Sequence, residues 1–130
     1  MDIGQRALDY HNKGFNCAQS VFAACCEYTG MDEKTALALS AGFGGGARSG
    51  ELCGAVTGAV MAEGLVFPFT DGQDIAAKDK IASIAKQCVS IAREKYGHVS
   101  CEELKGNIDC MEIIAFMAKT AEDIMNKEKT

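Results

Sequence analysis

The segment 51–67 is almost free of charge, and this feature constrains the fold more than any other. Its only charged residues are Glu51, in the first turn of a predicted helix, and Glu63. A helix that is apolar nearly all round has to be covered by other elements. The segment therefore predicts a buried central helix, in which Glu63 is either a buried acid with a raised pKa or a residue at the exposed end.

Small residues recur every four positions in this helix, at Gly54, Gly58 and Ala62. Each glycine inside a helix costs about 1 kcal/mol relative to alanine. Their spacing leaves a groove on one face, in which another backbone can approach closely. We expect close helix packing in this groove, which is also suited to a homodimer.

Apolar periodicity and capping residues predict further helices on both sides of the central one, at 2–13, 17–28, 32–41, 73–96, 100–105 and 109–127. No segment shows the alternation of a strand, and aromatic residues are sparse, with no Trp and three Tyr. The chain is long enough for one core but too short for two. We therefore predict an all-α, single-domain bundle of residues 1–130, with five to six helices around the buried central helix.

Composition excludes several classes of partner. The net charge is −5 and the pI about 5.0, and no basic block is present, so no nucleic-acid partner is expected. The uncharged stretches are too short for membrane insertion, and the N-terminal residues do not resemble a secretory signal. A cytoplasmic location is the expectation.

Seven cysteines in 130 residues is a high and odd number, which in a reducing compartment indicates metal binding, redox activity or core packing. Four of them fall at predicted helix starts: Cys17, Cys53, Cys101 and Cys110. All but Cys53 directly follow Asn, Ser or Asp and stand two residues before Gln or Glu, the pattern of a capping box. Cys53 is placed in the first turn of the central helix.

Helix starts favour the ionised form of cysteine, because unpaired N–H groups and a partial positive charge stabilise a thiolate. We therefore expect Cys17, Cys53, Cys101 and Cys110 to converge as redox or metal-ligand thiols. The other three cysteines fall in helix interiors and are interpreted as core residues: Cys25, Cys26 and Cys88.

A glycine-dense loop at 42–50 precedes the central helix. It matches G-x-G-x-x-A, but the strand that a dinucleotide site requires before it is missing. The loop is better interpreted as a close approach to the cysteines, with N–H groups for an anion or a cluster sulfur. Arg48 either stabilises a thiolate at Cys53 or is solvated. The predicted cofactor-binding residues are Gly44, Gly45, Gly46, Arg48 and Gly54.

Cys53-Gly54-Ala55-Val56-Thr57-Gly58 fits the CGAxxG signature, and the order of the four cysteines extends the match over the chain. The sequence thus resembles the C_GCAxxG_C_C family, whose label is redox-active. A related domain occurs in split-Soret cytochromes, joined to a haem-binding segment. This chain has no C-x-x-C-H, so covalent c-type haem is not expected, and no C-x-x-C, so a thioredoxin-type dithiol is not indicated.

Three hypotheses for the function remain open. In the first, the four cysteines serve redox chemistry or electron transfer with an unidentified redox partner, by holding an iron–sulfur cluster or by thiol–disulfide cycling. In the second, the same thiolates close a structural zinc site. In the third, the chain is a helical scaffold or dimerisation module with inert cysteines.

Overall fold

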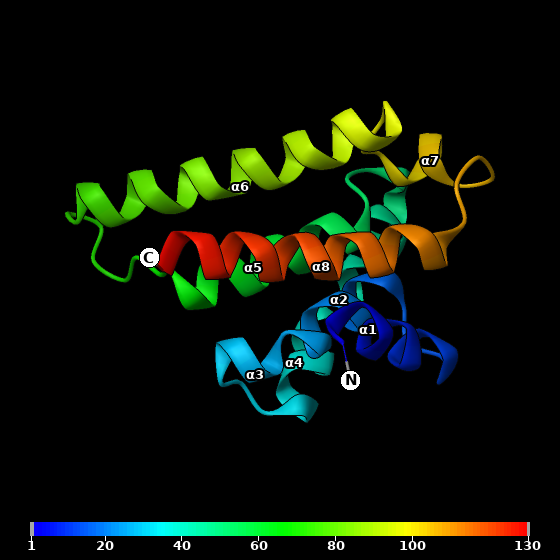
Figure 1. Ribbon diagram of the computed structural model, residues 1–130, viewed down its shortest axis with the longest axis horizontal. Coiled ribbons are helices and arrows are strands. Elements are labelled where there is room, and N and C mark those ends of the chain that lie inside the picture. The colour runs from blue at the N-terminus through cyan, green and yellow to red at the C-terminus, as the bar shows by residue number, and fades with distance from the viewer. Residues whose placement is uncertain (1, 130) are drawn as a thin grey trace.

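The protein is described by a computed structural model that covers residues 2–129, in which helices account for nearly all regular structure (Figure 1). The eight α-helices of these residues are α1 Ile3–Asn12, α2 Cys17–Ala24, α3 Cys26–Thr29, α4 Glu33–Ser40, α5 Gly54–Val66, α6 Ile75–Tyr96, α7 Cys101–Leu104 and α8 Cys110–Lys129. A 3-10 turn, η1 (Ala41–Phe43), and a wide turn, η2 (Gly46–Gly50), lie between α4 and α5. The all-α prediction is confirmed.

The predicted count of five to six helices is not confirmed. The helix expected at 17–28 is divided at Cys25, which ends α2 and precedes the short α3. The remaining helices lie where they were predicted, to within a few residues at each end. Asp32 and Asp74 cap α4 and α6 by accepting hydrogen bonds from backbone N–H groups, at 3.0 Å in each case.

The central helix α5 is buried, and it packs against α2, α6 and α8. It begins at Gly54, however, and not at Glu51 as predicted. Residues 51–53 are held in an extended conformation, because they pair with residues 99–101 through Cys53 N–H to Val99 O at 2.8 Å and Cys101 N–H to Glu51 O at 2.6 Å. A contact with a distant part of the chain thus replaces the first helical turn.

The small-residue groove of α5 is filled by α2 of the same chain. A Cβ atom added at Gly58 would lie 2.8 Å from the carbonyl oxygen of Ala18, which is closer than real Cβ atoms approach. A Cβ atom at Gly54 would lie 3.1 Å from the Ala18 nitrogen. The predicted close approach is therefore confirmed, and the backbone that makes it is α2.

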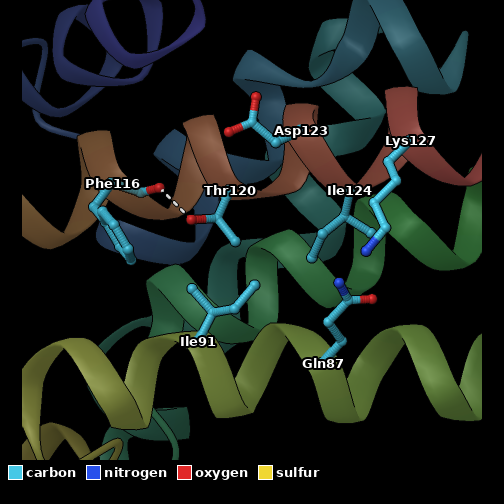
Figure 2. Close-up of a pocket in the computed structure, with 7 residues that line it drawn as sticks. All are labelled: Gln87, Ile91, Phe116, Thr120, Asp123, Ile124 and Lys127. Carbon is cyan, nitrogen blue, oxygen red and sulfur yellow. Dashed lines mark hydrogen bonds between the residues drawn. The ribbon is translucent and has the colours of Figure 1, made fainter.

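The two longest helices, α6 and α8, lie side by side in Figure 1. Between them is a cavity of about 270 Å³, in which Ile91 of α6 faces the α8 side chains (Figure 2). The Thr120 hydroxyl donates a hydrogen bond of 2.8 Å to the Phe116 carbonyl oxygen at its edge. No predicted site residue lines this cavity. Within residues 2–129, every helix is too short or too polar to cross a membrane.

Candidate functional site: a cavity lined by four cysteines

All four cysteines at the predicted helix starts line one small cavity. The other lining residues come from α7, its following loop and α8: Leu104, Lys105, Ile108 and Ile113. The cavity has a volume of about 30 Å³, comparable with the volume of one water molecule in the liquid. Of the elements that carry lining residues, α7 and the start of α8 lie at the same end of the molecule in Figure 1.

Cys17 is the first residue of α2, as predicted. Asn16 accepts a hydrogen bond from the Gln19 backbone at 2.9 Å, and the Gln19 side chain accepts one from the Asn16 backbone at 3.1 Å. This reciprocal capping box fixes the direction in which α2 starts. Cys17 is thereby held at the start of the helix, where it is half-buried.

The Cys17 sulfur has neighbours that stabilise its thiolate. The first is the Cys53 thiol, and the others include the backbone N–H groups of Gly45 and Ala18. These donors stabilise the thiolate more than burial opposes it, so the pKa of Cys17 is lowered from 9.0 to about 6. The lowered pKa favours the thiolate of Cys17, which is the nucleophilic form of cysteine.

Cys53 is the donor of this pair and has the opposite acidity. It is the N-cap residue of α5 and is 6% exposed. Its pKa is raised, first because its proton bonds to Cys17 and then because the thiol is buried. Gly54 allows the close contact, since a Cβ atom at this position would lie 2.5 Å from the Cys17 sulfur.

Cys101 reaches the cavity through the short pairing of 51–53 with 99–101, which sets it beside the Cys53 segment. The Ser100 hydroxyl caps α7 by accepting the Glu103 N–H at 3.2 Å. Cys101 is the first residue of α7, as predicted, and is half-buried.

Cys110 is the first residue of α8, also as predicted, and is exposed. The Asp109 carboxylate accepts the Met111 N–H at 2.9 Å and caps this helix. Burial raises the pKa of Cys110, and the neighbouring Cys17 and Cys101 sulfurs raise it further. A thiolate at Cys17 thus makes it harder to form a second one at Cys110.

The glycine-dense loop forms a left-handed turn. Four successive residues have positive φ angles: Gly45 at 64°, Gly46 at 65°, Ala47 at 59° and Arg48 at 60°. For the two residues with side chains this costs about 1–2 kcal/mol each. The turn directs the Gly45 N–H to the Cys17 sulfur, which is the approach to the cysteines that the sequence predicted.

The other predicted cofactor-binding residues have packing roles or lie further out. A Cβ atom at Gly44 would overlap the Asn16 side chain, and one at Gly46 would overlap the Glu51 backbone. Arg48 is exposed and lines an outer cavity together with Cys101, not the inner cavity with Cys53. Lys105, which the sequence analysis did not single out, lines both cavities. The one feature of the sequence that could have pointed to Lys105 is its position four residues after Cys101.

The core interpretation of Cys25 and Cys88 agrees with their complete burial, whereas Cys26 is half-buried. Glu63 is fully buried as well, and neither carboxyl oxygen has a well-formed hydrogen bond. Burial raises its pKa from 4.5 to about 8, partly opposed by the nearby Cys88 thiol. Of the two alternatives for Glu63, the buried acid is therefore correct.

A shared cavity is not yet a metal site. Among residues 2–129, no three His, Cys, Asp or Glu side chains are arranged so that they could hold a metal ion. The two histidines of the chain have neighbours outside the cavity. His98 lies 2.9 Å from Glu103, and His11 Nδ1 lies 3.0 Å from the Phe15 carbonyl oxygen. The cluster and zinc hypotheses stay predictions.

Comparison with known proteins gives one match. A family model described as "Putative redox-active protein (C_GCAxxG_C_C)" matches residues 15–124. No curated protein and no solved structure matches the chain. The matched span contains all four cysteines of the cavity and the left-handed turn.

Proposed function

The chain belongs to the C_GCAxxG_C_C family, whose description assigns a redox role, and on this premise we propose that it is a thiol–disulfide redox protein with Cys17 and Cys53 as its reactive pair. The observation that carries the proposal is that the Cys17 sulfur lies against the backbone of Gly54, next to Cys53, in the cavity that both cysteines line. Two cysteines placed in this way need little movement to form a disulfide.

The acidities of the pair assign the two roles. The Cys17 thiolate attacks one sulfur of an incoming disulfide and forms a mixed disulfide, while the other sulfur leaves as a thiolate and takes a proton. Cys53 then loses its proton and attacks the Cys17 sulfur, which releases the second thiol. In balance, the protein dithiol is oxidised to a Cys17–Cys53 disulfide and the incoming disulfide is reduced to two thiols.

The surroundings suit this exchange in both directions. The N–H groups of Gly45 and Ala18 stabilise Cys17 as a thiolate, both before its attack and when it leaves again on reduction. The buried position of Cys53 keeps the resolving thiol away from solvent oxidants.

The test is to equilibrate the protein in thiol–disulfide buffers of increasing potential and to map its disulfides by mass spectrometry. We expect one linked peptide pair that joins Cys17 to Cys53, lost in Cys17→Ser and in Cys53→Ser. Cys26→Ser is the matched control, because Cys26 does not line the cavity. A fully reduced protein at every potential, or a disulfide between other cysteines only, contradicts the proposal.

A second candidate function is ligation of an iron–sulfur cluster or of zinc, and the specific observation that favours it is that four cysteines line one cavity. The present geometry does not fit either group, because the side chains are not arranged as metal ligands. The cavity, with room for about one water molecule, is also too small for a cluster. Anaerobic purification followed by iron, sulfide and zinc analysis tests this candidate. Stoichiometric metal that is lost in Cys110→Ser supports it, and metal-free protein rejects it.

A further inference from the structure

A second, open cavity lies outside the four-cysteine cavity and shares two residues with it. It has a volume of about 330 Å³ and is lined by Gly45, Arg48, Gly50, Cys101, Glu102 and Lys105. The shared residues are Cys101 and Lys105. Cys101 is therefore the only one of the four cysteines that lines both the outer and the inner cavity.

The outer cavity is lined by three charged side chains. Arg48 and Lys105 are cationic and Glu102 is anionic, and all three are exposed. Within the part of the chain that the structure describes, none of the three side chains forms an ion pair. Two positive groups and one negative group at one cavity are complementary to a molecule that carries carboxylates and an ammonium group.

The left-handed turn that carries Arg48 is tightly packed. Arg48 has a φ angle of 60° in this turn. The turn packs directly on α7, since a Cβ atom at Gly50 would lie 3.2 Å from the Cβ atom of Glu102. The positions of these charges relative to Cys101 are therefore set by backbone packing.

We propose that the outer cavity binds a small amino-acid-derived disulfide and that Cys101 relays its oxidation to the Cys17–Cys53 pair. This inference rests on the thiol–disulfide function proposed above. The cavity volume of about 330 Å³ lies at the lower end of the range for small-molecule sites, which fits a ligand of roughly a dozen non-hydrogen atoms. The disulfide of an amino acid has this size and carries both carboxylates and ammonium groups.

The relay consists of three exchanges. The Cys101 sulfur attacks one sulfur of the ligand, forms a mixed disulfide and releases one amino-acid thiol. The Cys17 thiolate then attacks the Cys101 sulfur and releases the second amino-acid thiol. Finally, Cys53 attacks Cys17, which restores the Cys101 thiol and leaves the Cys17–Cys53 disulfide, so that two electrons pass from the protein to the ligand.

The test measures the rate at which the pre-reduced protein reduces four small disulfides that differ in charge: cystine, 3,3′-dithiodipropionate, cystamine and bis(2-hydroxyethyl) disulfide. We expect Arg48→Gln and Lys105→Gln each to slow reaction with cystine and dithiodipropionate by about tenfold, the usual order for a charge-assisted hydrogen bond. Reaction with the uncharged hydroxyethyl disulfide stays unchanged. Glu102→Gln slows the reaction with cystine and not that with dithiodipropionate, which has no ammonium group.

The matched control is Lys34→Gln, since Lys34 is exposed on α4 and lines neither cavity. Cys101→Ser is expected to abolish the preference for cystine over hydroxyethyl disulfide. Equal losses with charged and uncharged disulfides in Arg48→Gln, or an unchanged cystine rate in Cys101→Ser, overturn the inference while leaving the reactive pair intact. Failure of the wild-type protein to reduce any of the four disulfides rejects the thiol–disulfide function itself.

Discussion

Cys17 and Cys53 line one cavity and have opposite acidities, because each is the first cause of the other's pKa shift. Backbone N–H groups of the left-handed turn and of α2 also lower the pKa of Cys17. Cys53 is almost completely buried. The contact between the two thiols is the first cause of this difference, and burial and backbone N–H donors act after it.

The acidity of Cys17 depends on the proton of Cys53. We expect the alkylation rate of Cys17 to follow a pKa of about 6 in the wild-type protein. In Cys53→Ala, which removes the donor, this pKa moves upward toward the ordinary value of about 8.5. Cys53→Ser is the matched control, because its hydroxyl can still donate and keeps the pKa low. Iodoacetamide labelling between pH 4 and 9, followed by mass spectrometry, measures both shifts, and identical profiles in all three proteins contradict the prediction.

Gly54 is required by the contact between α2 and α5. In Gly54→Ala the new methyl group meets the Cys17 sulfur and the Phe43 carbonyl oxygen, at 2.5 and 3.0 Å without relaxation. We expect a loss of about 1–3 kcal/mol in the free energy of unfolding and a raised pKa of Cys17. Gly64→Ala in the same helix is the control, since no atom lies within 4 Å of its added Cβ, and it should gain up to about 1 kcal/mol. Urea denaturation measures the stability of both variants. Equal changes in the free energy of unfolding would contradict the close contact at Gly54.

Glu63 makes stability fall as pH rises. Its pKa is about 8 in the folded protein and near 4.5 in the unfolded chain, so between these values the folded state binds the extra proton. The contribution of Glu63 to the free energy of unfolding is fully present below pH 4.5. It is lost progressively up to pH 8, by about 1.4 kcal/mol per pH unit at most. In Glu63→Gln this slope should vanish. Urea denaturation from pH 5 to 9 measures it, with the exposed Glu94→Gln as a control that keeps the wild-type slope.

Ala47 is strained in the left-handed turn. Replacing it with glycine removes the steric cost of a Cβ atom at φ 59°, and we expect a gain of about 1 kcal/mol in the free energy of unfolding. Ala41→Gly is the matched control, because Ala41 has a right-handed conformation at φ −55° and glycine there should destabilise by about 0.5–1 kcal/mol. Thermal denaturation compares them, and a loss of stability in Ala47→Gly is the contrary outcome.

Local sequence signals predicted most helices and three of the four site positions. Cys17, Cys101 and Cys110 begin their helices because Asn16, Ser100 and Asp109 bond to backbone N–H groups close by in the chain. Such interactions act within one turn, so a single sequence reveals them. The four-residue spacing of Gly54 and Gly58 similarly predicted a close backbone approach, though not that α2 makes it.

The features that sequence analysis missed depend on contacts between distant segments. The start of α5 is displaced to Gly54 by pairing with residues 99–101, which no local pattern reveals. Ala47 and Arg48 are not residues that favour a left-handed turn, so only the surrounding packing accounts for it. Lys105 had no distinguishing motif, and its place between two cavities follows from how α7 packs on the turn η2.

The pairing of residues 51–53 with residues 99–101 also determines when the site can exist during synthesis. The whole of α5 and α6 separates the two segments in the chain, so a growing polypeptide cannot complete the cavity until α6 has been made and has folded back. The lining residues of α8, Cys110 and Ile113, are synthesised later still. An unfinished chain that ends with α6 thus still lacks Cys101 and Cys110, and the complete cavity appears only when nearly the entire protein is in place.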